Sequence, residues 1–593
     1  MAEIHYQGCG VLALISKHDL APQFDKDKFI KALSLLQHRG PNDFGTWVNR
    51  KLWLGHRRLA ILGSKITDGI QPRHSRQSVL CYNGEIYNCE ELRSFFQIQC
   101  KEKTDTEILQ YLLDTIGPEK SFSKLKGMFA FIYHNKINGK TYFVRDQLGI
   151  KPLFFYTNNS FSIFASEIAP IIFLLGKAEY DIDNIKKQIL FTSALVDQEK
   201  TLIKNIHFFT PGKVLEIGDN GNTTEIINDY RFVSRRSTLN YRDKLEKLEE
   251  LLHISCKRHL ISSVPVTLSV SGGLDSSLIM SMVNNYGDYG GYTIRYELAG
   301  SDMKIEDLES AKIFAKEKGY AIQEVKIDLS DLNFEYLCNI IELHSLSDDI
   351  RFFALDKMYS HIKNKTDNTV ILIGQGADEL FGGYISLHGY DNLEPKNSKI
   401  IIEKLLQNRF AIGAFNEVEK RNLFETNLSY LESLVCNSDD YYRQLLISNQ
   451  LRRVLAFEDH FSMRHSLEAR VPFLDKDIIE FAKELELCDM FFHDLKSNQK
   501  IDKRILSEIG NKYLPKLITN RKKSPYPTIP SAMITELLNN MFKNSQKILC
   551  QSDLMNQVFK KMDQEFWKKC CNRTKWNILV LIALERKVNS ILS

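Results

Sequence analysis

Residues 268–277, LSVSGGLDSS, form the most specific short pattern of the chain and decide the fold of its longer part. The apolar run from Pro265 to Val270 predicts a strand, and the segment that starts at Leu274 predicts a helix. Two glycines between them allow a sharp turn that exposes backbone N–H groups at the start of the helix. These donors and the serine hydroxyls predict a cradle for an anion with several oxygens; a turn that only caps the helix is the alternative.

The residues of this loop narrow the kind of anion that it would bind. The Gly-Lys-Ser/Thr ending of a Walker loop is missing, so the segment is not a Walker loop. Asp275 stands inside the loop, where a carboxylate is useful if it holds a Mg²⁺ ion that is bound to the phosphate. The pattern therefore predicts a site for a phosphate group together with its magnesium ion.

The sequence around this loop alternates between strands and helices from about residue 235 onward. The strand-like run YGGYTIRYE precedes the helix-like run DLESAKIFAKEKG, and TVILIGQGADELFGG follows another helical stretch. Such alternation is typical of an α/β domain with a parallel sheet. Beyond about residue 400 the chain is mostly helical in pattern.

The first part of the chain, from about residue 9 to 230, has a different pattern. Short β-branched and aromatic runs bounded by turn residues, such as GVLALIS, SVLCYNGEIYN and MFAFIYHN, predict packed sheets. Helical runs such as DTEILQYLLDTI lie between them. The change of pattern predicts two domains that are joined near residues 225–240.

Composition excludes several classes of protein. A chain of 593 residues is too long for one core, and a net charge of +4 gives no reason to expect nucleic acid or a membrane surface as a partner. No apolar run approaches the roughly 20 residues that span a bilayer, and the start of the chain does not resemble a signal peptide. Eleven cysteines without a CxxC pair favour free thiols, so we expect a cytoplasmic protein.

Four segments of the C-terminal part resemble asparagine synthetases, in the order found in that family. They are SGGLDSS (271–277), LIGQGADELFGGY (372–384), SMRHSLEARVPFLD (462–475) and KRILSEIGNKYLP (503–515). The first segment is also similar to the pyrophosphate loop of ATP-pyrophosphatases, which activate a carboxylate or carbonyl oxygen as an adenylate. The resemblance implies an α/β parallel-sheet ATP-pyrophosphatase domain with a helical C-terminal part over residues 240–593.

The resemblance also implies roles for individual residues. Asp275 and Asp378 would hold Mg²⁺ against the ATP phosphates, and Lys503, placed by the resemblance on a helix, would neutralise charge that develops between the α- and β-phosphates. Fixed cations in a dry site stabilise such charge strongly, although a solvated helix lysine is the common alternative. The implied ATP-binding residues are Leu268, Ser269, Ser271, Gly272, Gly273, Asp275, Ser276, Ser277, Gly374 and Gln375.

Five segments of the N-terminal part resemble class II glutamine amidotransferases. They are LQHRGPNDFG, LGHRRLAI, YNGEIYN, KTDTE and RDQLGIKPLFF, and CGVLAL (9–14) is similar to the family's opening. The resemblance implies an α+β N-terminal-nucleophile hydrolase sandwich (αββα) over residues 9–230. In that family a first-residue cysteine attacks the glutamine amide and its own α-amine moves the proton. We therefore expect residues 1–8 to be a propeptide that is removed to expose Cys9.

The remaining glutaminase residues follow from the same resemblance. The Asn83 side chain and the Gly84 backbone N–H would form the oxyanion hole, and Arg58 would bind the glutamine α-carboxylate. Glu85 and Asp105 would hold the glutamine α-amino group. Taken singly, Asn83-Gly84 would more often be a hairpin turn, and Asp105 could be an ordinary carboxylate at a helix start.

The two halves together imply an ATP- and glutamine-dependent enzyme that amidates a carboxylate through an acyl-adenylate, with aspartate as the expected acceptor and a homodimer as an assembly to test. Asp349 and Arg351 are the candidate acceptor-binding residues, with a structural salt pair as the alternative. Three departures weaken the aspartate assignment. Gln375 and Ser507 replace a glutamate and an arginine of the family, and SDDIRFFALDKM (347–358) lacks its proline. Another carboxylate as acceptor, and a regulatory relative without glutaminase activity, remain alternatives.

Overall fold

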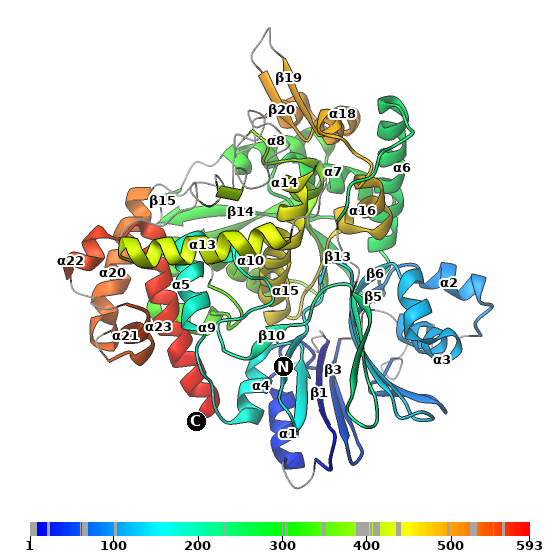
Figure 1. The fold of residues 1–593 in the computed structure, drawn as a ribbon. Coiled ribbons are helices and arrows are strands. Elements are labelled where there is room, and N and C mark those ends of the chain that lie inside the picture. The colour runs from blue at the N-terminus through cyan, green and yellow to red at the C-terminus, as the bar shows by residue number, and fades with distance from the viewer. Residues whose placement is uncertain are drawn as a thin grey trace.

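The described residues of the computed structural model form two antiparallel sheets, a mostly parallel sheet and a hairpin (Figure 1). The described residues are 9–20, 24–59, 61, 69–99, 104–228, 232–298, 301–302, 306–346, 351–386, 402–403, 406, 415–434, 440–494, 499–521, 531–549, 551–559 and 564–593.

The two antiparallel sheets each have six strands and come from the N-terminal part of the chain. The first has the order β10 (Ile206–Phe208), β8 (Phe154–Thr157), β9 (Phe161–Ala165), β1 (Gly10–Ser16), β3 (Leu52–Arg58) and β2 (Asp43–Val48). The second has the order β12 (Thr223–Asn228), β11 (Lys213–Ile217), β7 (Thr141–Arg145), β6 (Gly127–Asn135), β5 (Ser78–Ile86) and β4 (Arg73–His74).

The side-chain pattern of β1 explains how these sheets are layered. Val11, Ala13 and Ile15 pack into a core that also contains residues of the second sheet, so they face the space between the sheets. Leu12 and Leu14 point the other way and belong to the core beneath helices. Both faces of the strand are therefore buried, which explains its continuous apolar sequence.

Helices cover the outer faces of both sheets. The helices α1 (Lys26–Ser34) and α4 (Ile168–Leu175) pack against the first sheet, and α2 (Cys89–Phe95) and α3 (Asp105–Lys124) pack against the second. The helix α5 (Ile182–Phe191) follows α4. This order of layers confirms the predicted αββα sandwich.

The mostly parallel sheet lies in the C-terminal part. Its order is β16 (Ile322–Asp328), β14 (Gly291–Leu298), β13 (Val266–Ser269), β17 (Val370–Leu372) and β18 (Glu468–Arg470), with β15 (Ser301–Asp302) antiparallel to β14. The chain runs from β13 outward through β14 and β16, and then returns to the other side of β13 as β17. The sheet thus reverses its direction of growth between β13 and β17, which is where ligands bind in open α/β sheets.

Helices surround this sheet and make up most of the chain beyond residue 400, as predicted. They are α6 (Tyr241–His259), α7 (Leu274–Val283), α8 (Glu306–Lys318), α9 (Phe334–Ile340), α10 (Arg351–Lys365), α11 (Ala377–Phe381), α13 (Glu417–Ser433), α14 (Tyr441–Leu445), α15 (Arg452–Arg464), α16 (Lys476–Ala482), α17 (Leu487–Met490), α18 (Arg504–Tyr513), α19 (Lys516–Thr519), α20 (Ser531–Leu549), α21 (Asp553–Val558), α22 (Gln564–Lys569) and α23 (Asn572–Leu592). The hairpin of β19 (Phe491–Asp494) and β20 (Gln499–Asp502) precedes α18. Within the described ranges no helix is long and apolar enough to cross a membrane.

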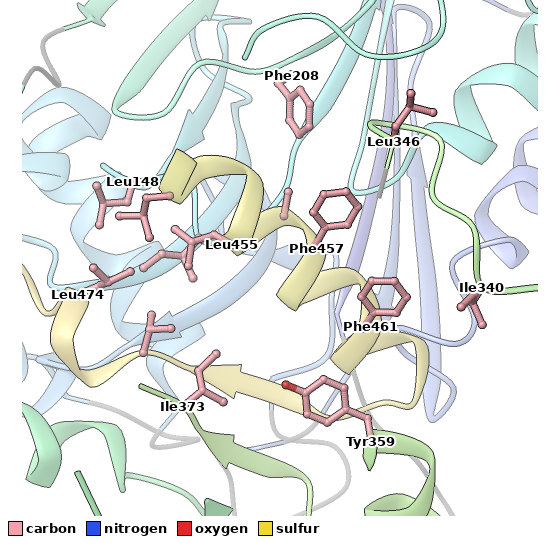
Figure 2. Close-up of a cluster of buried hydrophobic side chains, with 14 of the residues drawn as sticks. Leu148, Phe208, Ile340, Leu346, Tyr359, Ile373, Leu455, Phe457, Phe461 and Leu474 are labelled. Carbon is pink, nitrogen blue, oxygen red and sulfur yellow. The ribbon is translucent and has the colours of Figure 1, made fainter. Parts of the chain in front are cut away.

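The helix α15 lies between the sandwich and the parallel sheet. Figure 2 shows Phe208 of β10 on one side of this helix, and Ile373 and Tyr359 on the other. Leu455 and Phe457 of α15 are buried within this apolar cluster. The two halves of the chain therefore share one continuous core in the region of α15.

Candidate active sites

Cys9 stands immediately before β1, at the same end of the first sheet as Arg58 of the neighbouring strand β3. The strand register pairs Gly10 with Arg57, which places Cys9 next to Arg58, a buried residue at the end of β3. The Cys9 Sγ accepts a hydrogen bond from the Leu59 N–H at 3.3 Å, and Arg39 Nε donates to the Cys9 carbonyl oxygen at 3.1 Å. Burial raises the pKa of the Cys9 thiol to about 11, so a base is needed to make it a nucleophile at neutral pH. Residues 1–8 lie outside the described residues.

Asn83 and Gly84 lie within β5 rather than in a turn. The Asn83 Nδ2 is buried, and no described residue gives it a hydrogen-bond partner. Gly84 has a φ of 151°, and a Cβ there would lie 2.1 Å from the Met128 carbonyl oxygen, so only glycine fits. An unpartnered buried donor is costly, and a ligand oxygen would satisfy it.

The carboxylates of Glu85, in β5, and Asp105, at the start of α3, lie close together. Glu85 Oε2 accepts from Arg470 Nη2 at 2.9 Å, while its buried Oε1 has no hydrogen-bond partner among the described residues. Asp105 begins α3, and its Oδ2 accepts from the Tyr82 hydroxyl at 2.6 Å. Burial and then the nearby Asp105 charge raise the pKa of Glu85. This pair of carboxylates is suited to hold an amino group.

A chain of buried ions connects this site to the C-terminal half. Arg39 Nη2 lies 2.8 Å from Asp459, and Lys151 Nζ lies 3.6 Å from Asp459 and 3.5 Å from Glu468. Arg470 then contacts both Glu468 and Glu85 at 2.9 Å. The members, in order, are Arg39, Asp459, Lys151, Glu468, Arg470 and Glu85. Consecutive members have opposite charges, so each buried ion is compensated by its neighbours.

The loop after β13 has the geometry of an anion cradle. Gly272 has a φ of 76°, and a Cβ there would lie 2.3 Å from the Asp307 carbonyl oxygen, which explains the glycine. Ser271 and Ser276 hydroxyls lie 3.1 Å apart, and Gly273 is the residue before α7. The fully buried Ser277 hydroxyl has no hydrogen-bond partner in the described part of the chain, so it is available for a ligand oxygen.

The remaining predicted ATP-binding residues adjoin this loop. Leu268 is buried in β13, and the Ser269 hydroxyl points to the Met358 sulfur at 3.9 Å. Gly374 and Gln375 follow β17, and a Cβ on Gly374 would lie 3.1 Å from the Ser276 nitrogen. The two loops therefore meet at the reversal point between β13 and β17.

Lys503 contacts both predicted magnesium ligands. Its ammonium lies 2.7 Å from Asp275 Oδ1 and 2.8 Å from Asp378 Oδ1. Burial disfavours its charge, but the Asp275 and Asp378 carboxylates outweigh this and raise the pKa of Lys503. Lys503 is the N-cap of α18, buried in a left-handed conformation (φ 52°), so it stands at the start of the expected helix and is not the solvated lysine of the alternative. Asp275 and Asp378 direct their carboxylates to the same point. Carboxylate oxygens are ligands that Mg²⁺ prefers, so these two residues fit that ion.

The structure does not test the predicted acceptor-binding pair, Asp349 and Arg351. Asp349 lies outside the described residues. Arg351 is the first residue of α10, and only its backbone is described.

Comparison with known protein families identifies the family to which the chain belongs. A family model described as asparagine synthase matches residues 247–586. The chain belongs to the asparagine synthase family. A second model, described as a glutamine amidotransferase domain, matches residues 8–230. Together the two matches confirm the prediction of a carbon–nitrogen ligase that uses glutamine for amidation.

Curated relatives of this asparagine synthase family member align over most of its length. Asparagine synthetase (glutamine-hydrolyzing) 1 of Bacillus subtilis is 29% identical, over 90% of this chain and 89% of its own. Asparagine synthetase (glutamine-hydrolyzing) 3 of the same organism is 27% identical, over 94% and 93%. Asparagine synthetase (glutamine-hydrolyzing) of Homo sapiens is 26% identical, over 91% and 87%.

The structure adds residues that the sequence did not single out. Glu468 and Arg470 lie in the segment 462–475 that resembles asparagine synthetases; they pair with each other, and Arg470 also reaches Glu85. Arg39 and Lys151 lie in two of the segments that carry the amidotransferase resemblance, so their position was a usable signal. Asp459 lies in none of the segments that carry a family resemblance, so the sequence did not indicate its role.

Proposed function

We propose that this chain makes asparagine from aspartate, glutamine and ATP, by way of an aspartyl-adenylate. Residues 9–230 would hydrolyse glutamine and residues 240–593 would form and amidate the adenylate. The observation that carries the proposal is the contact of Lys503 with Asp275 and Asp378 beside the loop after β13. A fixed cation at that place can neutralise charge that develops between the α- and β-phosphates.

In the adenylation step, the loop after β13 receives the phosphates of ATP. Ser271, Gly273 and Ser277 would grip the departing pyrophosphate, and the unpartnered Ser277 hydroxyl supports this role. Leu268, Ser269, Gly272 and Ser276 would line the site, with Gly374 and Gln375 on its other side. Mg²⁺ held by Asp275 and Asp378 would supply additional positive charge to the phosphates.

In the glutaminase step, the Cys9 thiolate would attack the side-chain amide of glutamine. The unpartnered Asn83 Nδ2 and the Gly84 N–H would stabilise the oxyanion, with each donor lowering the barrier by about 3 kcal/mol. Arg58 would bind the α-carboxylate of glutamine, and Glu85 and Asp105 its α-amino group. The base would be the α-amine of Cys9, which requires that residues 1–8 are removed.

Aspartate is proposed as the acceptor because the relatives that align over most of the chain are named asparagine synthetases. Asp349 and Arg351 would contact it. A homodimer in the cytoplasm belongs to the same proposal, and light scattering of the purified protein tests the dimer.

The test uses the purified full chain with ATP, MgCl₂, glutamine and one acid at a time, with AMP, pyrophosphate and amide product measured by mass. We expect equal amounts of AMP, pyrophosphate and asparagine with aspartate. Pyrophosphate formed only with a different acid would show that the acceptor is wrong. No pyrophosphate with any acid would show that the adenylation itself is wrong.

A further inference from the structure

Amide formation from an acyl-adenylate and ammonia releases one proton. The nitrogen that attacks carries three hydrogens, and the amide keeps two. As the C–N bond forms, the C–O bond to AMP breaks and its electron pair leaves with the phosphate oxygen. In a site that excludes water, a side chain must accept the proton, and this requirement rests on the function proposed above.

Glu458 of α15 is a buried carboxylate next to the adenylation site. Its Oε2 accepts a hydrogen bond from Gln375 Nε2 at 3.4 Å, and its Oε1 accepts one from the Tyr359 hydroxyl. Gln375 itself lies between Gly374, which adjoins Ser276, and the loop that leads to Asp378. Gln375 therefore connects Glu458 to the residues that are expected to bind ATP.

The surroundings of Glu458 are unusual for a buried acid. Within the described part of the chain it makes no ion pair, whereas the next residue, Asp459, pairs with Arg39 and Lys151. Burial raises the pKa of Glu458, and the hydrogen bonds from Tyr359 and Gln375 oppose this only in part. A buried carboxylate without a cation lowers stability, and a raised pKa makes it a better proton acceptor near neutral pH.

Glu458 and Asp459 connect α15 to the two sites. Asp459 contacts Arg39, which donates to the Cys9 carbonyl oxygen, while Glu458 contacts Gln375 on the other side. Consecutive side chains leave a helix about 100° apart, which allows this division. Figure 2 shows α15 between Phe208 and Ile373, in the apolar region that joins the two halves. If ammonia crosses from Cys9 to the adenylate, as the proposed function requires, a direct path between the two sites runs past this helix.

We propose that Glu458 is the general base that takes the proton from the attacking nitrogen, and that Gln375 and Tyr359 position its carboxylate. Gln375 cannot serve as the base, because an amide does not accept a proton at neutral pH. The proton moves from nitrogen to a carboxylate oxygen of Glu458 as the C–N bond forms, and it returns to solvent before the next turnover.

The test compares Glu458→Gln with the wild-type full chain. Glutamine at this position keeps the size of the side chain but cannot take a proton. With saturating ammonium chloride, amide formation should fall on the order of 10²-fold or more. ATP–pyrophosphate exchange with aspartate and glutamine hydrolysis should stay near the wild-type rates, because neither step needs this base. Equal amide formation by both proteins would overturn the proposal.

A rescue separates catalysis from a structural role. The double variant Gln375→Glu, Glu458→Gln moves the carboxylate across the existing hydrogen bond, and it should recover at least a tenth of the wild-type rate. Glu342→Gln is the matched control, because Glu342 is a carboxylate with only 11% of its side chain exposed and it pairs with His460 of α15 rather than with Gln375. Failure of the double variant to recover, or an equal loss in the control, would contradict the role of Glu458. A wild-type protein that makes no amide would instead refute the proposed function.

Discussion

The reactivity of Cys9 depends on whether the peptide bond before it is cut. Burial raises the pKa of its thiol to about 11, so little thiolate exists at neutral pH unless a base lies beside it. In the proposed glutaminase step, the α-amine of Cys9 is that base. We predict that the intact mass of the active protein corresponds to residues 9–593. A protein that retains residues 1–8 and still hydrolyses glutamine would contradict the amine as base.

His134 allows a prediction about stability and pH. Burial lowers its pKa to about 4, from a value near 6.5 in the unfolded chain. Between these values the unfolded state binds the proton and the native state does not, so stability falls as pH drops from 6.5 to 4.

The variant His134→Gln removes this proton uptake. The free energy of unfolding should therefore fall less between pH 7 and pH 5 in the variant than in the wild type, by about 2 kcal/mol. Urea midpoints at the two pH values measure the difference. Parallel pH dependence of the two proteins would contradict a neutral, buried His134.

Among the helices and strands, the start of α18 determines where the Lys503 ammonium lies. Lys503 adopts a left-handed conformation there and directs its ammonium to Asp275 and Asp378. Left-handed backbone is uncommon for a lysine, and such conformations concentrate at functional sites. The position of the ammonium therefore depends on where β20 ends and α18 begins.

We predict that Lys503→Met lowers ATP–pyrophosphate exchange by about 10²–10³-fold, because it removes one fixed cation from the transition state. Methionine retains much of the length of the side chain. Glutamine hydrolysis measured in the same preparation is the control and should change little. An unchanged rate of ATP–pyrophosphate exchange would show that Lys503 has no role in adenylation.

The elements were more predictable than the contacts between them. The apolar runs of β1, β5 and β13 predicted strands correctly, because period and residue type are local properties. Asn83 and Gly84 alone would suggest a turn, yet they lie in a strand whose partner β6 is distant in sequence. The contact of Arg470 with Glu85 joins residues 385 positions apart, and no local pattern reports such a pair.

At the scale of the whole molecule, the ion chain from Arg39 to Glu85 links the two halves. Arg470 is its most connected member, since it also donates to the carbonyl oxygens of His259 and Ile261. Removing one partner from a buried ion pair leaves an uncompensated charge, which costs about 3–5 kcal/mol.

We predict that Arg470→Met lowers the thermal midpoint by several degrees and raises the KM for glutamine, because Glu85 loses its partner. Arg242→Met is the matched control, since Arg242 is exposed and pairs only weakly with Glu246 at the surface. Calorimetry and glutaminase kinetics measure both effects. An unchanged KM would separate Arg470 from the glutamine site.

Transfer of nitrogen from glutamine to asparagine within one protein is the step that the proposed function depends on. Glutamine labelled with ¹⁵N in its side-chain amide is supplied with ATP, MgCl₂, aspartate and unlabelled ammonium, and the asparagine that forms is measured by mass. We predict ¹⁵N in the asparagine amide well above its share in the free ammonium pool, and loss of that label in Cys9→Ala. Labelled ammonium without labelled asparagine, while ATP is consumed, would contradict it.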